Sequence, residues 1–198
     1  MKIAIHQPEH FPYMGFFQKM EAADMFVILD DVQFTKGNFQ HRNRLLNNMG
    51  KEEWFTIPLE KKPHHKKIKD IKTNDTTEWR DKIVKQFLRN HTLISNLRYE
   101  ILNLRDIYSS SNLIDINLAS IDLCRKKLNI DTPLLLSSEL NIKTKGSQKL
   151  SDICNRLKAS EYISGQGAKE YLNESIFDCK VSFFKPEVEN HYTTLQHI

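Results

Sequence analysis

The 198-residue chain lacks the features that mark several large classes of protein. No apolar run approaches the ~20 residues that a membrane-spanning helix needs, so we expect no membrane span. The three cysteines, Cys124, Cys154 and Cys179, are odd in number and widely spaced, which fits neither a disulfide framework nor a zinc motif. The first apolar residues meet a His-Gln-Pro break at once, so no signal-peptide core is predicted. A cytoplasmic protein with free thiols is therefore expected.

Several catalytic signatures are missing as well. The chain has no Ser-His-Asp order, no Walker loop, no dinucleotide fingerprint and no Asp-x-Asp metal motif of glycosyltransferases. His6 and His10 are four residues apart, but Pro8 and Pro12 prevent the regular helix that would make them a metal-binding pair. We expect no metal site, and the sequence identifies no cofactor.

Positive charge is concentrated in one stretch of the chain. Residues 36–72 hold ten Lys or Arg and four Asp or Glu, a net +6, whereas the whole chain carries +4. The run from Lys61 to Lys67, with His64 and His65 inside it, is suited to the phosphates of a nucleotide or of a nucleic-acid backbone. A solvated loop between two strands explains the same run, and both interpretations stay open.

Short apolar runs at residues 2–5 and 25–29 predict two strands, with a helix at 14–23 between them. This order is a βαβ unit, in which the two strands are parallel and the crossover is right-handed. Further strands are expected at 54–59, 133–136, 162–164 and 181–184, and further helices at 79–88, 93–108, 113–128, 147–158 and 168–172. Ser147 is expected to be a helix N-cap, and Asn129 to end a helix in the left-handed conformation.

These elements predict an α/β fold with an open, mostly parallel sheet, flanking helices and a helical middle segment. The chain is expected to form a single domain over residues 1–198, with a helical insertion at roughly 78–128.

Dense polar chemistry follows both N-terminal strands. Ligands of open α/β sheets bind beyond the carboxyl ends of the strands, so we expect the site there. His6, Asp30 and Asp31 are the predicted catalytic residues, because imidazole and carboxylate groups can move protons. Asp30 and Asp31 are adjacent, so only one is expected to enter the crevice. The alternative for this pair is an Asx turn that caps the strand.

The predicted substrate-binding residues are hydrogen-bonding or cationic side chains, together with a late glycine. Gln7 suits an amide, a sugar hydroxyl or a base edge. Lys36, Arg42 and Arg44, expected in one loop, suit phosphate, although a solvated loop is an equal alternative. The full set is Gln7, His10, Tyr13, Gln33, Lys36, Arg42, Asn43, Arg44, Ser164 and Gly165.

Two blocks of the chain carry a family resemblance. The first block contains His6-Gln7-Pro8, Pro12-Tyr13-Met14-Gly15, Ala23-Asp24, Leu29-Asp30-Asp31-Val32-Gln33-Phe34, Lys36, Arg42-Asn43 and Gly50, and the second contains Ser138-Glu139-Leu140, Tyr162-Ile163-Ser164-Gly165 and Tyr171-Leu172. In order and spacing the blocks resemble the WbqC-like protein family. His41 departs from the family pattern, which tends to have Asn there.

Members of this family are typically encoded among the genes for bacterial O-antigen and related surface glycans. The resemblance therefore implies a role in the assembly of such glycans. It also implies a further carboxy-terminal segment, so we expect a short family member or a chain that lacks this segment. The chain also resembles, more weakly, proteins of the nucleotidylyltransferase-like α/β fold. Tyr13-Met14-Gly15-Phe16 stands where those enzymes carry a His-x-Gly-His motif. Both histidines are absent, so that catalysis is not implied.

Three functions compete at this point. The first, and the one we favour, is a cytosolic transferase that moves an acyl or aminoacyl group to or from a nucleotide-activated amino sugar. The second is a basic protein that binds or modifies tRNA or DNA, suggested by the 36–72 block with nearby Trp54 and Phe55. The third is a non-catalytic subunit that binds a nucleotide sugar. A phosphate-bearing small molecule is the expected ligand.

Overall fold

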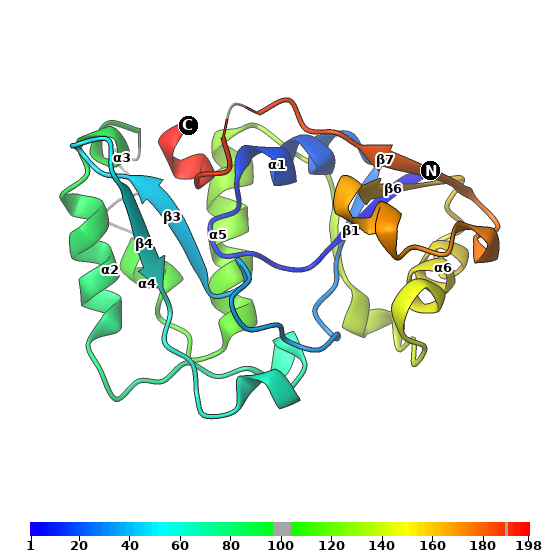
Figure 1. The fold of residues 1–198 in the computed structure, drawn as a ribbon, viewed down its shortest axis with the longest axis horizontal. Coiled ribbons are helices and arrows are strands. Elements are labelled where there is room, and N and C mark those ends of the chain that lie inside the picture. The colour runs from blue at the N-terminus through cyan, green and yellow to red at the C-terminus, as the bar shows by residue number, and fades with distance from the viewer. Residues whose placement is uncertain (97–103, 189) are drawn as a thin grey trace. The chain divides into compact units, whose positions relative to one another are not determined.

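A computed structural model describes residues 1–96, 104–188 and 190–198 (Figure 1). The chain forms two compact units. We call Met1–Gln7, Gly15–Val32 and Ile130–Glu189 the sheet unit. Pro8–Met14, Gln33–Asn129 and Asn190–Ile198 make up the hairpin unit. The expectation of a single domain over the whole chain stays a prediction.

The strands are β1 (Lys2–His6), β2 (Met25–Ile28), β3 (Arg42–Leu46), β4 (Glu52–Thr56), β5 (Leu134–Leu136), β6 (Glu161–Gly165) and β7 (Lys180–Phe184). The α-helices are α1 (Met14–Glu21), α2 (Trp79–Leu88), α3 (His91–Asn96), α4 (Leu104–Ile107), α5 (Leu113–Lys127) and α6 (Gly146–Arg156). Short 3₁₀ helices are η1 (Pro63–His65), η2 (Ile68–Asp70), η4 (Ser137–Leu140), η5 (Gln166–Glu170), η6 (Glu174–Ile176) and η7 (Thr194–Gln196).

The sheet unit is built on five parallel strands in the order β5-β2-β1-β6-β7, of which β1, β6 and β7 are labelled in Figure 1. The predicted α/β class with an open parallel sheet is confirmed. Strands β2 and β5 lie on one side of β1, and the later strands β6 and β7 lie on the other side. The order in which strands are added to the sheet therefore reverses between β1 and β6. Open α/β sheets bind their ligands at this kind of switch point, outside the carboxyl ends of the strands.

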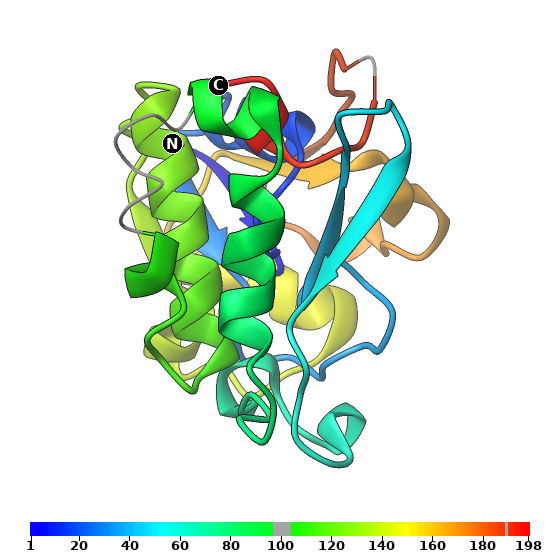
Figure 2. The same ribbon diagram turned by 90° about the vertical axis from the view of Figure 1, so that its left-hand side faces the viewer.

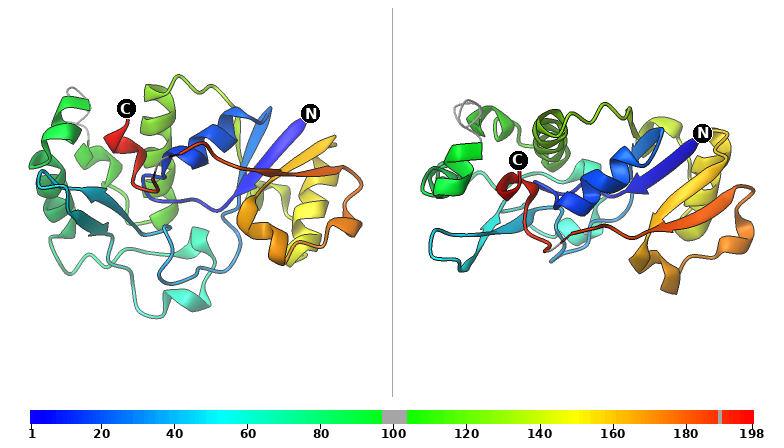
Figure 3. Two further views of the ribbon diagram at one scale, coloured as in Figure 1. Left: turned by 45° about the horizontal axis from the view of Figure 1, so that its top comes forward. Right: turned by 90° about the horizontal axis from the view of Figure 1, so that it is seen from above.

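Alternation along β1 directs its side chains to the two faces of the sheet. Ile3 and Ile5 belong to a buried cluster with Ile153 and Cys154 of α6, the yellow helix in Figure 3. His6 lies on the other face, where its ring meets Phe16 of α1 edge-on at 5.0 Å between centroids. Helices α1 and α6 therefore cover opposite faces, and both can supply side chains to the carboxyl edge.

The hairpin unit combines the antiparallel pair β3–β4 with helices α2 to α5. Figure 2 shows the cyan hairpin beside the green helix α2. Its core is aromatic: Phe55 of β4 meets Phe87 of α2 edge-on at 4.9 Å between centroids. Phe11, buried with φ +45°, packs against the same two rings.

Most predicted elements are present, and helix α2 has the predicted bounds. Asn129 has the expected left-handed φ, +55°. Ser147 as an N-cap is wrong: α6 begins at Gly146, and the Ser147 hydroxyl instead accepts a hydrogen bond from the Asn173 amide. The predicted helix at 93–108 coincides in part with α3 and α4, while residues 97–103 lie outside the described residues. The helix expected at 168–172 is the 3₁₀ helix η5, which begins two residues earlier.

The expected loop holding Lys36, Arg42 and Arg44 is wrong for the two arginines, which lie in strand β3. Asn43 and Leu45 are buried, whereas Arg42, Arg44 and Leu46 are half-buried. This alternation is that of a strand, but one of its two buried residues is polar, so the sequence shows no apolar run.

Candidate functional site

The carboxyl edge of the parallel sheet gathers the polar residues that follow its strands. His6 ends β1, Asp30 and Asp31 follow β2, Ser137 follows β5, and Gly165 ends β6. The strands are parallel, so all these positions are at the same edge. Sequence motifs more than 100 residues apart are brought together here.

Both aspartates reach the same hydroxyl group. The Oγ atom of Ser137 lies 2.6 Å from Asp31 Oδ1 and 3.0 Å from Asp30 Oδ1, and all three residues are buried. This differs from the expectation that only one carboxylate enters the site. Strand β2 ends at Ile28, so the alternation of side chains no longer applies to the two aspartates.

Lys149 of α6 completes the group. Its Nζ atom donates to Asp31 Oδ2 at 2.7 Å and to the Ile142 carbonyl at 3.0 Å. Lys149 lies in the first turn of α6, where the helix dipole disfavours a cation. The buried Asp31 carboxylate supplies the compensating charge, which fixes both side chains in one geometry.

The two carboxylates are held differently. Both oxygens of Asp31 are engaged, by Ser137 and by Lys149. Asp30 uses only Oδ1, which accepts from the Ser138 amide at 2.9 Å and contacts Ser137. Within the described residues no hydrogen bond reaches Asp30 Oδ2. The Ser137 hydroxyl carries one proton, so it serves one carboxylate at a time and can turn from one to the other.

His6 is a neutral imidazole at this edge. Burial, helped by the positive charge of Lys19, lowers its pKa from 6.5 to about 3, against a hydrogen bond to Gln7 that raises the pKa. Nδ1 lies 3.0 Å from the Gln7 carbonyl, which only accepts, so Nδ1 carries the proton and Nε2 has the lone pair. Lys19 is itself buried and donates to the Ile5 carbonyl at 3.2 Å. Gln7 is half-buried beside His6.

On the other side of the switch point, Ser164 is buried and Gly165 half-buried. Ser164 Oγ donates to the Tyr162 hydroxyl at 3.3 Å. Burial raises the pKa of Tyr162, so its hydroxyl stays protonated. Apart from Gly165 itself and its two chain neighbours, no atom lies within 4 Å of the place where a Cβ of Gly165 would be, so there is open space beside its Cα.

The predicted cations belong to the hairpin unit. The guanidinium groups of Arg42 and Arg44 lie 4.6 and 5.5 Å from the Trp54 ring centroid. Arg42 donates to the Gly37 carbonyl at 2.5 Å, so it is joined to the loop that carries the exposed Lys36. Arg44 pairs with Glu52 at 2.9 Å. Arg42 and Arg44 thus lie against the same ring on one face of the hairpin, and Lys36 directly precedes the glycine whose carbonyl Arg42 contacts.

Other predicted binding residues of the hairpin unit have structural contacts. His10 is fully buried, 3.1 Å from the Tyr108 hydroxyl, and burial lowers its pKa to about 3. Asn43 is also buried and donates to the carbonyls of His10 and Phe11. Exposed Gln33 donates to the His64 carbonyl, and the ring of half-buried Tyr13 packs against that of His191 at an interplanar angle of 53°.

Sequence reasoning missed Ser137, Lys149 and Lys19. Ser137 directly follows a predicted strand, which was a usable signal. Lys149 and Lys19 are lysines on helices, where an exposed position is the ordinary expectation. Their burial depends on partners far along the chain, so the sequence alone gave no sign of it.

No group of three or more His, Cys, Asp or Glu suited to a metal ion occurs among residues 1–96, 104–188 and 190–198. In the same ranges no helix is both long and apolar enough to cross a membrane.

Comparison with known proteins gives a family and a relative. The chain is 29% identical over 181 residues to "Uncharacterized protein Rv1507c" of Mycobacterium tuberculosis (strain ATCC 25618 / H37Rv), a match that covers 89% of this chain and 78% of the relative. No solved structure matches the chain. Residues 7–197 match the model of the WbqC-like protein family, and the chain therefore belongs to that family.

Proposed function

We propose that this protein is a cytoplasmic transferase of bacterial surface-glycan assembly, which moves an acyl or aminoacyl group to or from a nucleotide-activated amino sugar. Membership of the WbqC-like family supports the glycan setting. The buried group of Asp30, Asp31, Ser137 and Lys149 at the carboxyl edge of a parallel sheet supports an enzyme. Desolvating four polar side chains is costly, and such groups are retained most often where they do chemistry.

Asp30 is the proposed proton acceptor. In acyl transfer, the amine of the acceptor sugar attacks the carbonyl carbon of the donor, a C–N bond forms and the bond to the leaving group breaks. The amine must lose a proton in this step. Asp30 Oδ2, which no hydrogen bond reaches within the described residues, is the atom best placed to take it.

Asp31 and Lys149 are proposed as positioning residues. The Asp31 carboxylate accepts hydrogen bonds from Lys149 and Ser137, so it orients the Ser137 hydroxyl that contacts Asp30. His6, neutral at pH 7, is proposed to contact the substrate at the carboxyl edge of the sheet. Gln7, Ser164 and Gly165 flank the switch point and are proposed to bind the sugar.

Within the hairpin unit, Lys36, Arg42 and Arg44 are proposed to bind a phosphate group. A planar guanidinium group binds phosphate through two parallel hydrogen bonds. Tyr13, Gln33, His10 and Asn43 stay predicted binding residues, although the burial of His10 and Asn43 favours a structural role.

The proposal is tested by a thermal-shift screen against nucleotides, nucleotide-activated sugars and aminoacyl donors. We expect a nucleotide-activated amino sugar to raise the melting temperature, and an acyl or aminoacyl product to form when a donor is added. Binding without any product would favour a non-catalytic nucleotide-sugar-binding subunit. No shift with any nucleotide sugar would count against the glycan role.

A further inference from the structure

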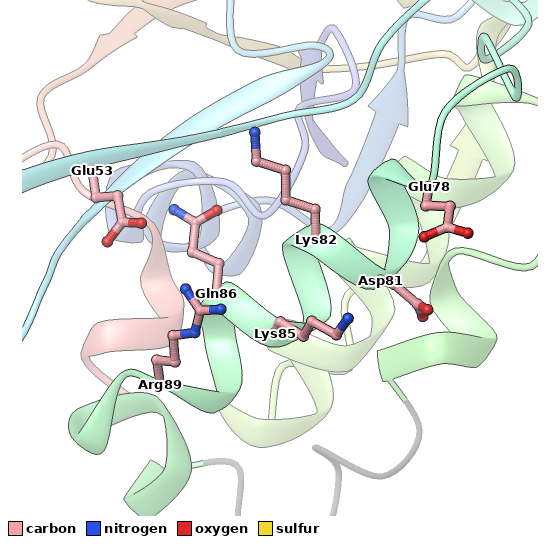
Figure 4. A pocket seen from close by; sticks show the side chains of 7 residues that line it. All are labelled: Glu53, Glu78, Asp81, Lys82, Lys85, Gln86 and Arg89. Atoms are coloured by element: carbon pink, nitrogen blue, oxygen red, sulfur yellow. The ribbon is translucent and has the colours of Figure 1, made fainter.

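The charged hollow beside helix α2 in the hairpin unit shows no preference for a ligand of one sign (Figure 4). Its lining sets the carboxylates of Glu53, Glu78 and Asp81 against the cations of Lys82, Lys85 and Arg89. Opposite charges in equal number attract neither anions nor cations from a distance. The sheet unit, in contrast, brings two reactive groups of the same kind together.

Helix α6 packs along the segment that leads into strand β7. The Ser151 hydroxyl donates to the Ile176 carbonyl at 2.7 Å. One turn further along the helix, the Asn155 amide donates to the Asp178 carboxylate at 2.8 Å. Side chains four residues apart lie on the same face of a helix, so these two hydrogen bonds hold one face of α6 against residues 176–178.

Cys154 and Cys179 lie beside these two hydrogen bonds. Cys154 directly precedes Asn155 and is three residues after Ser151, so it lies on the side of α6 that meets the segment. Cys179 directly follows Asp178 and packs against the buried cluster that contains Cys154. The two thiols are within hydrogen-bonding distance of each other. The fold thus brings together two cysteines that are far apart in the sequence.

The two thiols differ in their access to solvent. Cys154 is only 1% exposed, whereas Cys179 is half-buried, so a small reagent in solution reaches Cys179 first. Burial and the neighbouring Cys179 thiol raise the pKa of Cys154, so the Cys154 thiol is protonated in the resting protein. An accessible thiol next to a second, resolving thiol is typical of redox-sensing cysteines.

We propose that Cys154 and Cys179 form a reversible disulfide in the presence of hydrogen peroxide. The Cys179 sulfur attacks the peroxide, the O–O bond breaks, and a sulfenic acid and water form. The Cys154 sulfur then attacks the Cys179 sulfur and the S–O bond breaks. The departing hydroxide takes the Cys154 proton and leaves as water. The thiols together lose two electrons, which reduce the peroxide.

A dithiol reverses the reaction by thiol–disulfide exchange, which breaks the S–S bond and restores both thiols. Disulfides of cytosolic proteins are usually transient and redox-sensing, so a bond that forms only under oxidation agrees with the free thiols of the resting protein. This inference is independent of the proposed transferase chemistry.

The disulfide would fasten the end of α6 to the start of β7. It closes a loop of about 25 residues, which lowers the conformational entropy of the unfolded chain. We expect the oxidised protein to melt about 5–10 °C above the reduced protein. Lys149 is on the same helix, so oxidation also fixes the helix that supplies the partner of Asp31.

Peptide mapping tests the bond directly. The reduced full-length protein is treated with hydrogen peroxide under native conditions, alkylated in denaturant, digested and analysed by mass spectrometry. We expect a cross-linked pair of peptides that contain Cys154 and Cys179, with Cys124 alkylated. Dithiothreitol before alkylation should return all three cysteines to the alkylated form. This measurement uses the wild type and so depends on no variant.

Variants link the bond to the change in melting temperature. Cys179→Ser should abolish the peroxide-dependent rise, and it is expected to fold because Cys179 is half-buried. Cys124→Ala is the matched control. It also removes one cysteine, but from helix α5, so the cross-linked peptides and the rise in melting temperature should both remain.

Three results would overturn the proposal. The first is oxidation of Cys179 to sulfinic acid without any cross-link to Cys154, which would show that the two sulfurs do not meet. The second is a main product in which Cys124 is paired, or in which two protein molecules are joined. The third is a peroxide-dependent rise in melting temperature that persists in Cys179→Ser.

Discussion

Lys149 and Asp31 form an ion pair with 2.7 Å between Nζ and Oδ2, and their side chains are only 5% and 6% exposed. Asp31 follows the second strand of the sheet, whereas Lys149 is 118 residues later, on α6. Neither charge is solvated, so each depends on the other.

Removing Lys149 should therefore be severe. Lys149→Ala leaves the Asp31 carboxylate buried without its cation, and we expect a loss of about 3–5 kcal/mol in the free energy of unfolding. Urea denaturation at pH 7 measures this loss. Lys126→Ala, which breaks a pair whose lysine is 71% exposed, is the control and should cost less than about 1 kcal/mol. Equal costs for the two variants would show that the Lys149 pair is solvated.

Asp30 and Asp31 should respond differently to amidation. Asp30→Asn keeps an oxygen for the Ser138 amide but removes the proton acceptor, so turnover should fall at least about 100-fold, with nucleotide-sugar affinity nearly unchanged. Asp31→Asn removes the partner of Lys149 and should lower the melting temperature as well. The comparison uses product formation, ligand titration and thermal melting. A fully active Asp30→Asn enzyme would contradict the assigned role.

Arg42→Ala should weaken binding of a nucleotide-activated sugar by about tenfold, because a bidentate phosphate contact is lost. Arg42→Lys keeps the charge but not the planar fork, so it should restore only part of the affinity. Isothermal titration of both variants checks the ranking. Unchanged affinity in the Ala variant would remove Arg42 from the phosphate site.

Acid should destabilise the protein partly through its buried histidines. Burial lowers the pKa of His6 and of His10 from 6.5 to about 3, and for His10 nearby His41 adds to the effect. Between these values the unfolded chain binds protons that the folded protein does not, so stability falls as pH drops from about 6.5 toward 3.

Each histidine contributes at most about 1.4 kcal/mol per pH unit in that window. Denaturation curves at pH 7.5, 6 and 5 measure the slope for the wild type and for His10→Gln, which cannot titrate. The variant should show the shallower slope. Parallel slopes would mean that folding does not lower the pKa of His10.

Thiol labelling should distinguish the three cysteines. Cys124 and Cys154 are buried, and burial raises the pKa of both thiols, so neither forms thiolate readily. Only Cys179, which is half-buried, should react with a thiol reagent in the native protein. All three should react in denaturant. Rapid labelling of two or more native thiols would contradict the packing of α5 or α6.

The sequence predicted the parallel sheet well because its strands are buried on both faces. Runs such as Ile3–Ile5 and Met25–Leu29 are continuously apolar, and that pattern needs no knowledge of partners. The polar residues that follow β1 and β2 could also be recognised from the sequence, since strand ends are visible as a change of composition. The fold class followed from the order of these elements.

Strand β3 and the buried lysines were not predictable in the same way. Asn43 faces inward on β3, where its side-chain amide donates to the backbone carbonyls of His10 and Phe11. Both acceptors are more than 30 residues earlier in the chain. His10 has the residue type of a reactive group, yet its ring contacts the rings of Phe11, Phe55 and Tyr108, which come from three separate segments. Burial of a polar side chain is a tertiary property, so residue type and spacing could not reveal it.

The central position of β1 has a consequence for biosynthesis. Ala4 of β1 pairs on one side with Phe26, but its partner on the other side, Ile163, is 159 residues later. At about 5–20 residues per second, the ribosome needs roughly ten to thirty seconds to deliver that partner. During this interval the nascent chain presents an apolar strand with one open edge, which is a template for aggregation. Folding yield in cells should therefore depend on the chaperones that meet the emerging chain.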